Sequence, residues 1–279
     1  MAGEPAPLTL VCCNGVGVST FFWKYIVEHY RQRFQVMLWD YRGHGRSGSP
    51  VDIERADLTV ERSAEDLQCV LDAAGIQTPI VLLGHSMGVQ VILEYYRRYP
   101  DVVRALVPMF GTYGRPLDSF MGLRHARRAA RYLSRAILLG GKRSSRLLHP
   151  ITASPLAYAI GRRTGLVDRY YANRSDVHKY LEHLNKMDPR VFARMVDLIA
   201  DHDLEPFLPE IDVPTLVFGA DQDLFTPLEC SLKMARDIPN AELLVLADGS
   251  HAAIVEYPDT INRRLDRFLA ERVMSEPEP

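Results

Sequence analysis

Six short, continuously apolar runs alternate with longer helical patterns along this chain, and this alternation limits the fold more than any other feature. We expect strands at 8–13, 36–39, 80–83, 105–109, 215–218 and 243–246, and helices at about 20–33, 60–74, 87–98, 229–237 and 258–272. Runs that are apolar throughout are typical of parallel strands buried on both faces. The sequence therefore predicts an α/β fold with a doubly wound, mostly parallel sheet of about six strands.

The alternation stops between 109 and 215, where helical patterns continue without a convincing strand. We interpret this stretch as a helical cap or lid inserted into the sheet domain. The predicted organisation is a core domain made of residues 1–110 and 206–279, with a cap at 111–205. A chain of 279 residues is long enough for one such domain with an inserted lobe.

Bulk composition excludes several classes of protein. The net charge of −2 indicates no nucleic-acid partner, and no apolar run approaches the 18 residues of a membrane span. The first residues lack the basic region of a signal peptide. Four cysteines without a framework spacing favour buried free thiols, so we expect a cytoplasmic protein. They are Cys12, Cys13, Cys69 and Cys230.

The segment LLGHSMGVQ carries the clearest chemical signal. Gly84-His85-Ser86-Met87-Gly88 follows an expected strand and precedes an expected helix, which is the setting of a nucleophile elbow. The flanking glycines permit a turn tight enough to expose Ser86. The alternative is an ordinary turn between a strand and a helix.

An activated serine needs a base and an acid that orients the base. Asp221 and Asp223 follow the expected strand 215–218, and His251 follows the last one. The carboxyl ends of parallel strands meet at one edge of a sheet. Ser86, Asp223 and His251 are therefore expected to converge there, in the chain order serine, acid, histidine.

Four motifs make the chain resemble the α/β-hydrolase superfamily, in its branch of single-domain esterases, lipases and C–C bond hydrolases. They are WDYRGHGRSG (39–48), GHSMG (84–88), VPTLVFGADQDLFTP (213–227) and GSHAAIVEYP (249–258). The resemblance implies Ser86 as nucleophile, Asp223 rather than Asp221 as acid, and His251 as base, with no cofactor and no metal. It also implies a shortened sheet, because only seven residues precede the first expected strand.

The segment VCCNGVGVST at 11–20 has two possible meanings. Its Gly-x-Gly turn could hold a dinucleotide phosphate, with Asp40 on the ribose, but Thr20 stands at the third glycine position. The resemblance instead implies an oxyanion hole, built from the backbone N–H groups of Val16 and Met87. Relatives usually have His-Gly where this chain has Asn14-Gly15. We place four residues at the substrate: Asn14, Gly15, Phe21 and His85.

Charge is divided unevenly along the chain. Residues 111–200 contain 17 Arg and Lys against six Asp and Glu, while the rest has 16 against 29. A basic stripe (Arg124, Arg127 or Arg128, Arg131, Arg135) shares a helix with an apolar face (Phe120, Leu123, Ala126, Ala130, Leu133, Ile137). The stripe could pair with the acidic core, rest on anionic lipid, or receive an anionic substrate or carrier.

These features predict a serine hydrolase acting on a small-molecule carboxylic ester with a hydrophobic acyl group. The same triad could serve a thioester or C–C bond hydrolase. A non-catalytic small-molecule-binding protein on the same fold is the third hypothesis. Asp201, His202 and Asp203 lack the spacing of a metal site.

Overall fold

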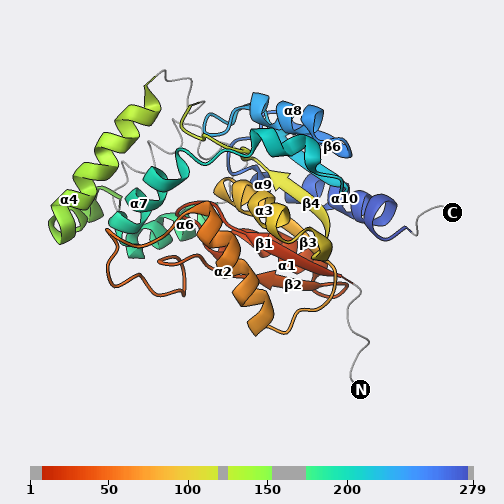
Figure 1. Ribbon diagram of the computed structural model, residues 1–279, viewed down its shortest axis with the longest axis horizontal. Helices are drawn as coiled ribbons and strands as arrows, with labels where there is room; N and C mark the ends of the chain where they lie inside the picture. Colours follow the sequence, from red (N-terminus) through yellow and green to blue (C-terminus); the bar gives the residue numbers. More distant parts are fainter. Residues whose placement is uncertain (1–7, 119–124, 153–173, 276–279) are drawn as a thin grey trace.

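A single sheet of six parallel strands forms the centre of the molecule (Figure 1). The computed structural model describes residues 8–118, 125–152 and 174–275. The strand order β2-β1-β3-β4-β5-β6 confirms the predicted doubly wound sheet. The strands are β1 (Thr9–Cys13), β2 (Gln35–Leu38), β3 (Ile80–His85), β4 (Val103–Met109), β5 (Thr215–Ala220) and β6 (Ala241–Leu246).

Helices cover both faces of the sheet and bury the apolar strands. On one face, α2 (Val60–Ala73), α3 (Met87–Arg98) and α8 (Leu228–Asp237) pack against alternate strand residues such as Val11 and Leu82. On the other face, α1 (Lys24–Tyr30) and α10 (Pro258–Phe268) pack against Leu10 and Leu83. β1 and β3 are buried over their whole length, which explains their continuously apolar sequences.

Two of the expected helices are interrupted. The helix expected at 20–33 is a 3₁₀ turn, η1 (Thr20–Trp23), followed by α1, and the chain turns at Arg31. The helix expected at 258–272 is α10 followed by a π-helical turn, η5 (Leu269–Val273). No described helix is both long enough and apolar enough to span a bilayer.

The cysteines are free thiols, as predicted, but they are not all buried. Cys12, Cys13 and Cys230 are buried, and burial raises the pKa of the Cys13 thiol to about 12. Cys69 is exposed, because it lies on the outer face of α2.

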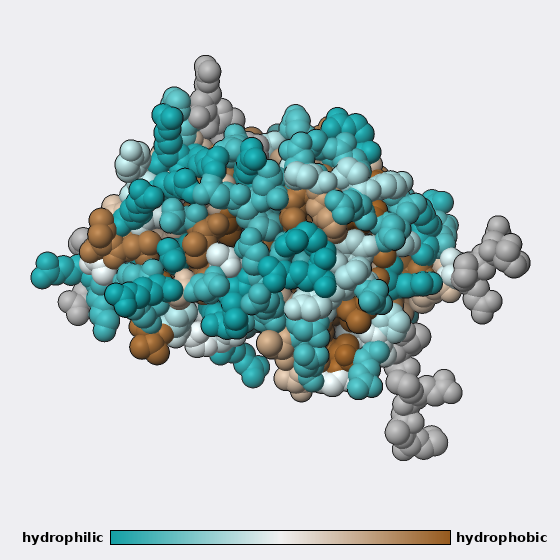
Figure 2. All heavy atoms as spheres, in the orientation of Figure 1, coloured by the Kyte–Doolittle hydropathy of each residue, from teal (hydrophilic) through white to brown (hydrophobic). Residues whose placement is uncertain are grey.

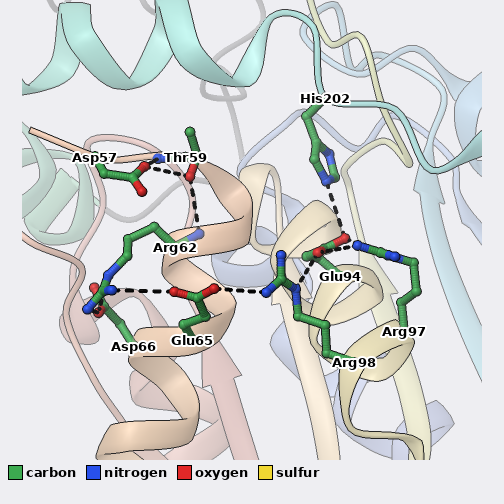
Figure 3. Close-up of polar contacts among 9 residues, drawn as sticks. All are labelled: Asp57, Thr59, Arg62, Glu65, Asp66, Glu94, Arg97, Arg98 and His202. Carbon is green, nitrogen blue, oxygen red and sulfur yellow. Dashed lines mark hydrogen bonds and ion pairs between the residues drawn. The ribbon is translucent and has the colours of Figure 1, made fainter.

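A network of charged side chains joins α2 to α3 beside the sheet (Figure 3). At its centre the buried carboxylate of Glu94 accepts hydrogen bonds from Arg97 and Arg98. Arg98 also bonds Glu65 on α2, 2.9 Å away, and His202, which lies shortly before β5 in the chain, approaches Glu94. Burial alone would raise the pKa of Glu94, but His202 and the two arginines outweigh it, so the pKa is lowered. The carboxylate is therefore ionised, and it holds Arg98 on α3 in the position from which Arg98 reaches Glu65 on α2.

Between β4 and β5 the chain forms α4 (Ala126–Thr152), α6 (Arg174–Lys186) and α7 (Pro189–Ile199), hereafter the insertion (Figure 1). Gly114 and Asp203 form an antiparallel bridge where the chain leaves and re-enters the sheet domain, so the insertion has a narrow base. Within α4 the helix is kinked at Gly141, whose dihedrals of φ 54° and ψ −139° are not helical. The domain boundaries at 111 and 205 stay a prediction.

Pairing with the acidic core domain was one of the three roles expected for the basic stripe, but the paired arginines of α4 have other partners. Arg127 and Arg131 both bond Asp201, and Arg131 also lies 3.7 Å from Asp197. Their partners are thus acids of the insertion, not of the core domain. Two of the ion pairs to the core start from α6 and α7: Lys24 bonds Asp176 at 2.6 Å, and Arg190 bonds Glu54 at 3.1 Å. Phe120, Leu123 and Arg124 lie outside the described residues.

Candidate active site

Ser86 occupies a strained turn between β3 and α3. Its φ of 56° and ψ of −120° lie where non-glycine residues are rarely found, so the surrounding structure must hold it there. The Ser86 N–H donates to Met109 O on the neighbouring strand, 3.2 Å away. Gly88 is required on the other side, because a Cβ there would lie 2.1 Å from Cys13 O. The turn therefore matches the predicted elbow in position and in conformation.

His251 and Asp223 meet Ser86 at the carboxyl edge of the sheet. His251 Nε2 lies 3.0 Å from Ser86 Oγ, and His251 Nδ1 lies 2.8 Å from Asp223 Oδ2. Asp223 follows β5 and His251 follows β6, as the sequence indicated. The three side chains form one hydrogen-bonded chain from hydroxyl to imidazole to carboxylate. Such a chain can pass the serine proton to the imidazole.

Asp223 is held as an ionised acceptor. Its Oδ1 accepts from the backbone N–H groups of Phe225 (2.8 Å) and Thr226 (2.9 Å), and its Oδ2 accepts from Thr226 Oγ1 (2.8 Å). Burial alone would raise the pKa of Asp223, but His251 and the donors of Thr226 lower it on balance. Asp221 is exposed, so the geometry favours Asp223 as the partner of His251.

His85, the residue before Ser86, contacts the loop that carries His251. Its Nε2 lies 2.9 Å from the backbone carbonyl O of His251, which can only accept a hydrogen bond, so Nε2 carries the proton. Burial lowers the pKa of His85 to about 3, with a further contribution from His251. The neutral imidazole of His85 therefore supports the loop that carries His251. The ring centroid of Phe22 lies 4.7 Å from that of His85.

The loop after β1 lies directly against Ser86. A Cβ on Gly15 would come within 2.9 Å of Ser86 Cβ and 3.4 Å of its Oγ, so only glycine fits there. No hydrogen bond found within the described residues uses the backbone N–H of Val16. Met87 is the first residue of α3, where a backbone N–H has no partner within the helix. Both N–H groups are thus available near Ser86.

Hydrogen bonds of Asn14 hold this loop in place. Its amide nitrogen donates to Trp39 O at 2.8 Å, and its amide oxygen accepts from Trp23 Nε1 at 2.7 Å. Tyr41 Oη donates to the carbonyl O of Asn14 at 2.9 Å. The Asn14 side chain is buried and its nitrogen and oxygen are both hydrogen-bonded, so it supports the loop instead of facing the cavity.

The second half of the loop is fixed by residues of the WDYRGHGRSG segment. Gly17 N donates to His44 Nε2 at 3.0 Å, and burial lowers the pKa of His44 to about 4, which keeps that nitrogen an acceptor. Asp40 accepts from Ser19 Oγ at 2.6 Å and from Arg46 N at 3.0 Å. Asp40 thus joins the loop after β1 to the WDYRGHGRSG segment. This structural role accounts for Asp40 without the ribose contact that a dinucleotide site would require.

An apolar cavity of about 520 Å³ opens above Ser86. Among the predicted site residues, Val16, His85, Ser86, Met87 and His251 line it, whereas Asn14, Gly15 and Phe21 do not. Phe22 takes the place expected for Phe21, whose ring instead lies 5.8 Å from that of His183. The insertion supplies the opposite wall, from residues that include Ala130, Leu133, Ile137, Tyr180, Phe192 and Val196.

Several residues of this site were missed by sequence reasoning. Thr226 stands in the quoted LFTP segment, so a search for donors to the acid could have found it. Gln90 lies one turn after Ser86 on α3 and also lines the cavity. Phe192, Val196 and Ile199 recur at helical spacing on α7, which signals an apolar face but not what it contacts.

The parallel sheet, the strained serine at the end of β3 and its hydrogen-bonded histidine define the class of α/β-fold hydrolases. A model of the family described as alpha/beta hydrolase fold matches residues 9–258, and the chain belongs to this family. A relative named "Putative carbamate hydrolase RutD", from Caulobacter sp. (strain K31), is 27% identical over 94% of this chain and 90% of its own length.

Solved structures show the same fold. A thermophilic esterase from Thermogutta terrifontis superposes with a TM-score of 0.75 at 22% identity, covering 96% of this chain and 91% of that one. MenH from S. aureus gives a TM-score of 0.75 at 21% identity, covering 97% and 96%. The family and its relatives support hydrolase activity for this chain.

Proposed function

We propose that this protein is a serine hydrolase that cleaves carboxylic esters with an apolar acyl group, through a covalent acyl-enzyme. One observation carries the proposal: the hydrogen-bonded chain from Ser86 through His251 to Asp223 lies at an apolar cavity of about 520 Å³. A nucleophile that lines an apolar pocket suits an uncharged, lipophilic carbonyl substrate.

In the first half-reaction His251 Nε2 takes the proton of Ser86 Oγ as the oxygen attacks the carbonyl carbon. Asp223 keeps Nδ1 protonated and stabilises the imidazolium that forms. The negative charge that develops on the carbonyl oxygen is accepted by the N–H groups of Val16 and Met87. The tetrahedral intermediate then expels the alcohol, which leaves with the proton from Nε2.

The second half-reaction repeats these steps with water. His251 removes a proton from a water molecule, whose oxygen attacks the acyl carbon bound to Ser86. The intermediate collapses to release the carboxylic acid, and Ser86 Oγ regains its proton from His251. Over the two half-reactions one ester and one water are consumed, one alcohol and one carboxylic acid are released, and Ser86 and His251 return to their starting protonation states.

The cavity favours a larger substrate than the name of the carbamate hydrolase relatives indicates. A free carbamate is small and anionic, and its charge would be desolvated against walls such as Leu133, Ile137 and Phe192. An acyl chain of several carbons would gain from burial in the same walls. We therefore expect the acyl part of the ester to determine which substrates the protein cleaves.

A serine-directed fluorophosphonate probe and a series of nitrophenyl esters test the proposal. Wild type should be labelled by the probe and should hydrolyse the octanoate faster than the acetate. Ser86→Ala should be neither labelled nor able to hydrolyse the esters. The exposed Ser49→Ala provides the matched control and should behave as wild type. Labelling that persists in Ser86→Ala would contradict the assignment of the nucleophile.

The same experiment separates the remaining alternatives. Thioester and diketone substrates belong in the panel, and a preference for either over every ester would move the assignment to that bond type. A wild type that is folded, unlabelled and inactive on all of them would indicate a binding protein.

A further inference from the structure

The outer surface of α4 combines apolar and basic side chains that no other part of the described structure covers. Tyr132 is 72% exposed and Leu139 is 91% exposed, although both are large and apolar. Arg128 and Arg135 are exposed beside them. The four residues, hereafter the α4 stripe, follow one another at spacings of four, three and four, so they form one line along the helix.

The arginines of the α4 stripe differ from their neighbours on the same helix. Arg127 and Arg131 are used in ion pairs with Asp201. Within the described ranges, Arg128 and Arg135 have no ion-pair partner. Their charges are therefore free to act on a partner outside the molecule.

The exposed apolar surface continues from the α4 stripe to the cavity. Leu133 is 62% exposed and at the same time lines the cavity, and Ala129 is likewise exposed and lines it. Figure 1 places α4 at the edge of the molecule farthest from the sheet, and Figure 2 shows apolar surface exposed at that end. A lipophilic molecule leaving an apolar phase at α4 would have an apolar path to Ser86.

The charge distribution orients the molecule toward an anionic surface. Residues 111–200 carry 17 basic and six acidic side chains, whereas the rest of the chain carries 16 basic and 29 acidic ones. An anionic surface attracts the insertion and repels the core domain. α4 belongs to the attracted part of the chain, and its residues 126–152 include no Asp or Glu.

We propose that the α4 stripe is a docking surface for anionic lipid bilayers. Tyr132 and Leu139 would enter the boundary between headgroups and acyl chains, while Arg128 and Arg135 contact lipid phosphates. A soluble anionic carrier would use the arginines but would gain nothing from the exposed tyrosine and leucine. The apolar residues therefore favour a bilayer over a carrier.

Co-sedimentation with vesicles tests this surface independently of catalysis. Wild type and Ser86→Ala should both bind vesicles of phosphatidylcholine mixed with phosphatidylglycerol, and neither should bind phosphatidylcholine alone. Binding should fall as salt is raised. Equal binding to neutral and mixed vesicles, or no binding to either, would overturn the proposal.

Matched double variants identify the residues responsible. Arg128→Gln/Arg135→Gln should weaken binding about thirtyfold, and Tyr132→Ser/Leu139→Ser about tenfold. The controls change exposed residues of the core domain, Arg104→Gln/Arg263→Gln and Leu232→Ser, and should bind as wild type.

The arginine variant, the tyrosine–leucine variant and the two controls should all hydrolyse a water-soluble ester at the wild-type rate, which shows that they are folded. If the arginine variant loses binding while the tyrosine–leucine variant keeps it, the partner is recognised by charge alone and the bilayer proposal fails.

Discussion

His85 Nε2 donates a hydrogen bond to the backbone carbonyl of His251 across 2.9 Å, so the residue before Ser86 supports the loop that carries His251. The two rings also lie 5.0 Å apart, centroid to centroid. A neutral imidazole in this position adds no charge next to His251. It fixes the distance between the turn of Ser86 and the loop of His251, on which the proposed proton transfer depends.

Replacing His85 by phenylalanine should lower kcat about tenfold and leave KM nearly unchanged, because the loop of His251 loses its brace. Since the pKa of His85 is lowered to about 3, the residue is neutral at every ordinary assay pH. The pH profile of kcat/KM should therefore fall in height without changing shape. His85→Gln keeps an N–H donor and should recover most of the rate. A profile whose midpoint moves in His85→Phe would argue against a purely positioning role.

Asp223→Asn should reduce kcat by about 10³- to 10⁴-fold, because the amide no longer stabilises the imidazolium or holds its tautomer. Asp221→Asn removes a carboxylate two residues away and should leave kcat unchanged. Steady-state kinetics on the best nitrophenyl ester make the comparison. Equal losses in the two variants would mean that the loop is disturbed, and a loss only in Asp221→Asn would reverse the assignment.

The strands of this fold could be predicted because burial on both faces leaves little room for polar residues. β1 and β3 are apolar over nearly their whole length, and the expected runs agree with them to within two residues at each end. The elbow was equally predictable, because the close approach at Gly88 and the strain at Ser86 demand a narrow sequence pattern.

Contacts between distant segments could not be predicted in the same way. Asn14 lies between Trp23 and Trp39 only because β1 pairs with β2, and nothing in the local pattern signals either partner. Phe21 and Phe22 are adjacent and alike in sequence, and the short turn η1 decides which of them faces the cavity. The partners of the α4 arginines likewise depend on how α4 packs against α7.

Asn14→Ala should lower the free energy of unfolding by about 3 kcal/mol, because the buried Trp23 Nε1 and Trp39 O both lose their partner. Urea unfolding measures this loss. The control Asn240→Ala removes an exposed amide that bonds Asp212 O at 2.8 Å, and it should cost less than about 1 kcal/mol. A small effect at Asn14 would mean that the loop before Val16 is held by other contacts.

Glu94 should make the protein sensitive to acid. Its folded-state pKa lies below the ordinary value of 4.5, so the unfolded chain takes up the proton first as the pH falls. The stabilisation from the ionised carboxylate is therefore complete at neutral pH and is lost progressively below about pH 4.5. At pH 7, Glu94→Gln should lower the free energy of unfolding by about 2 kcal/mol, and this difference from wild type should shrink as the pH falls through the acid range.

The control for Glu94 is Glu65→Gln, because Glu65 also bonds Arg98 but its side chain is 42% exposed. That change should cost less than about 1 kcal/mol, since water screens an exposed pair. Urea unfolding at a series of pH values compares the three proteins. A difference between wild type and Glu94→Gln that stays constant with pH, or that equals the effect of Glu65→Gln, would show that Glu94 contributes by packing and not by its charge.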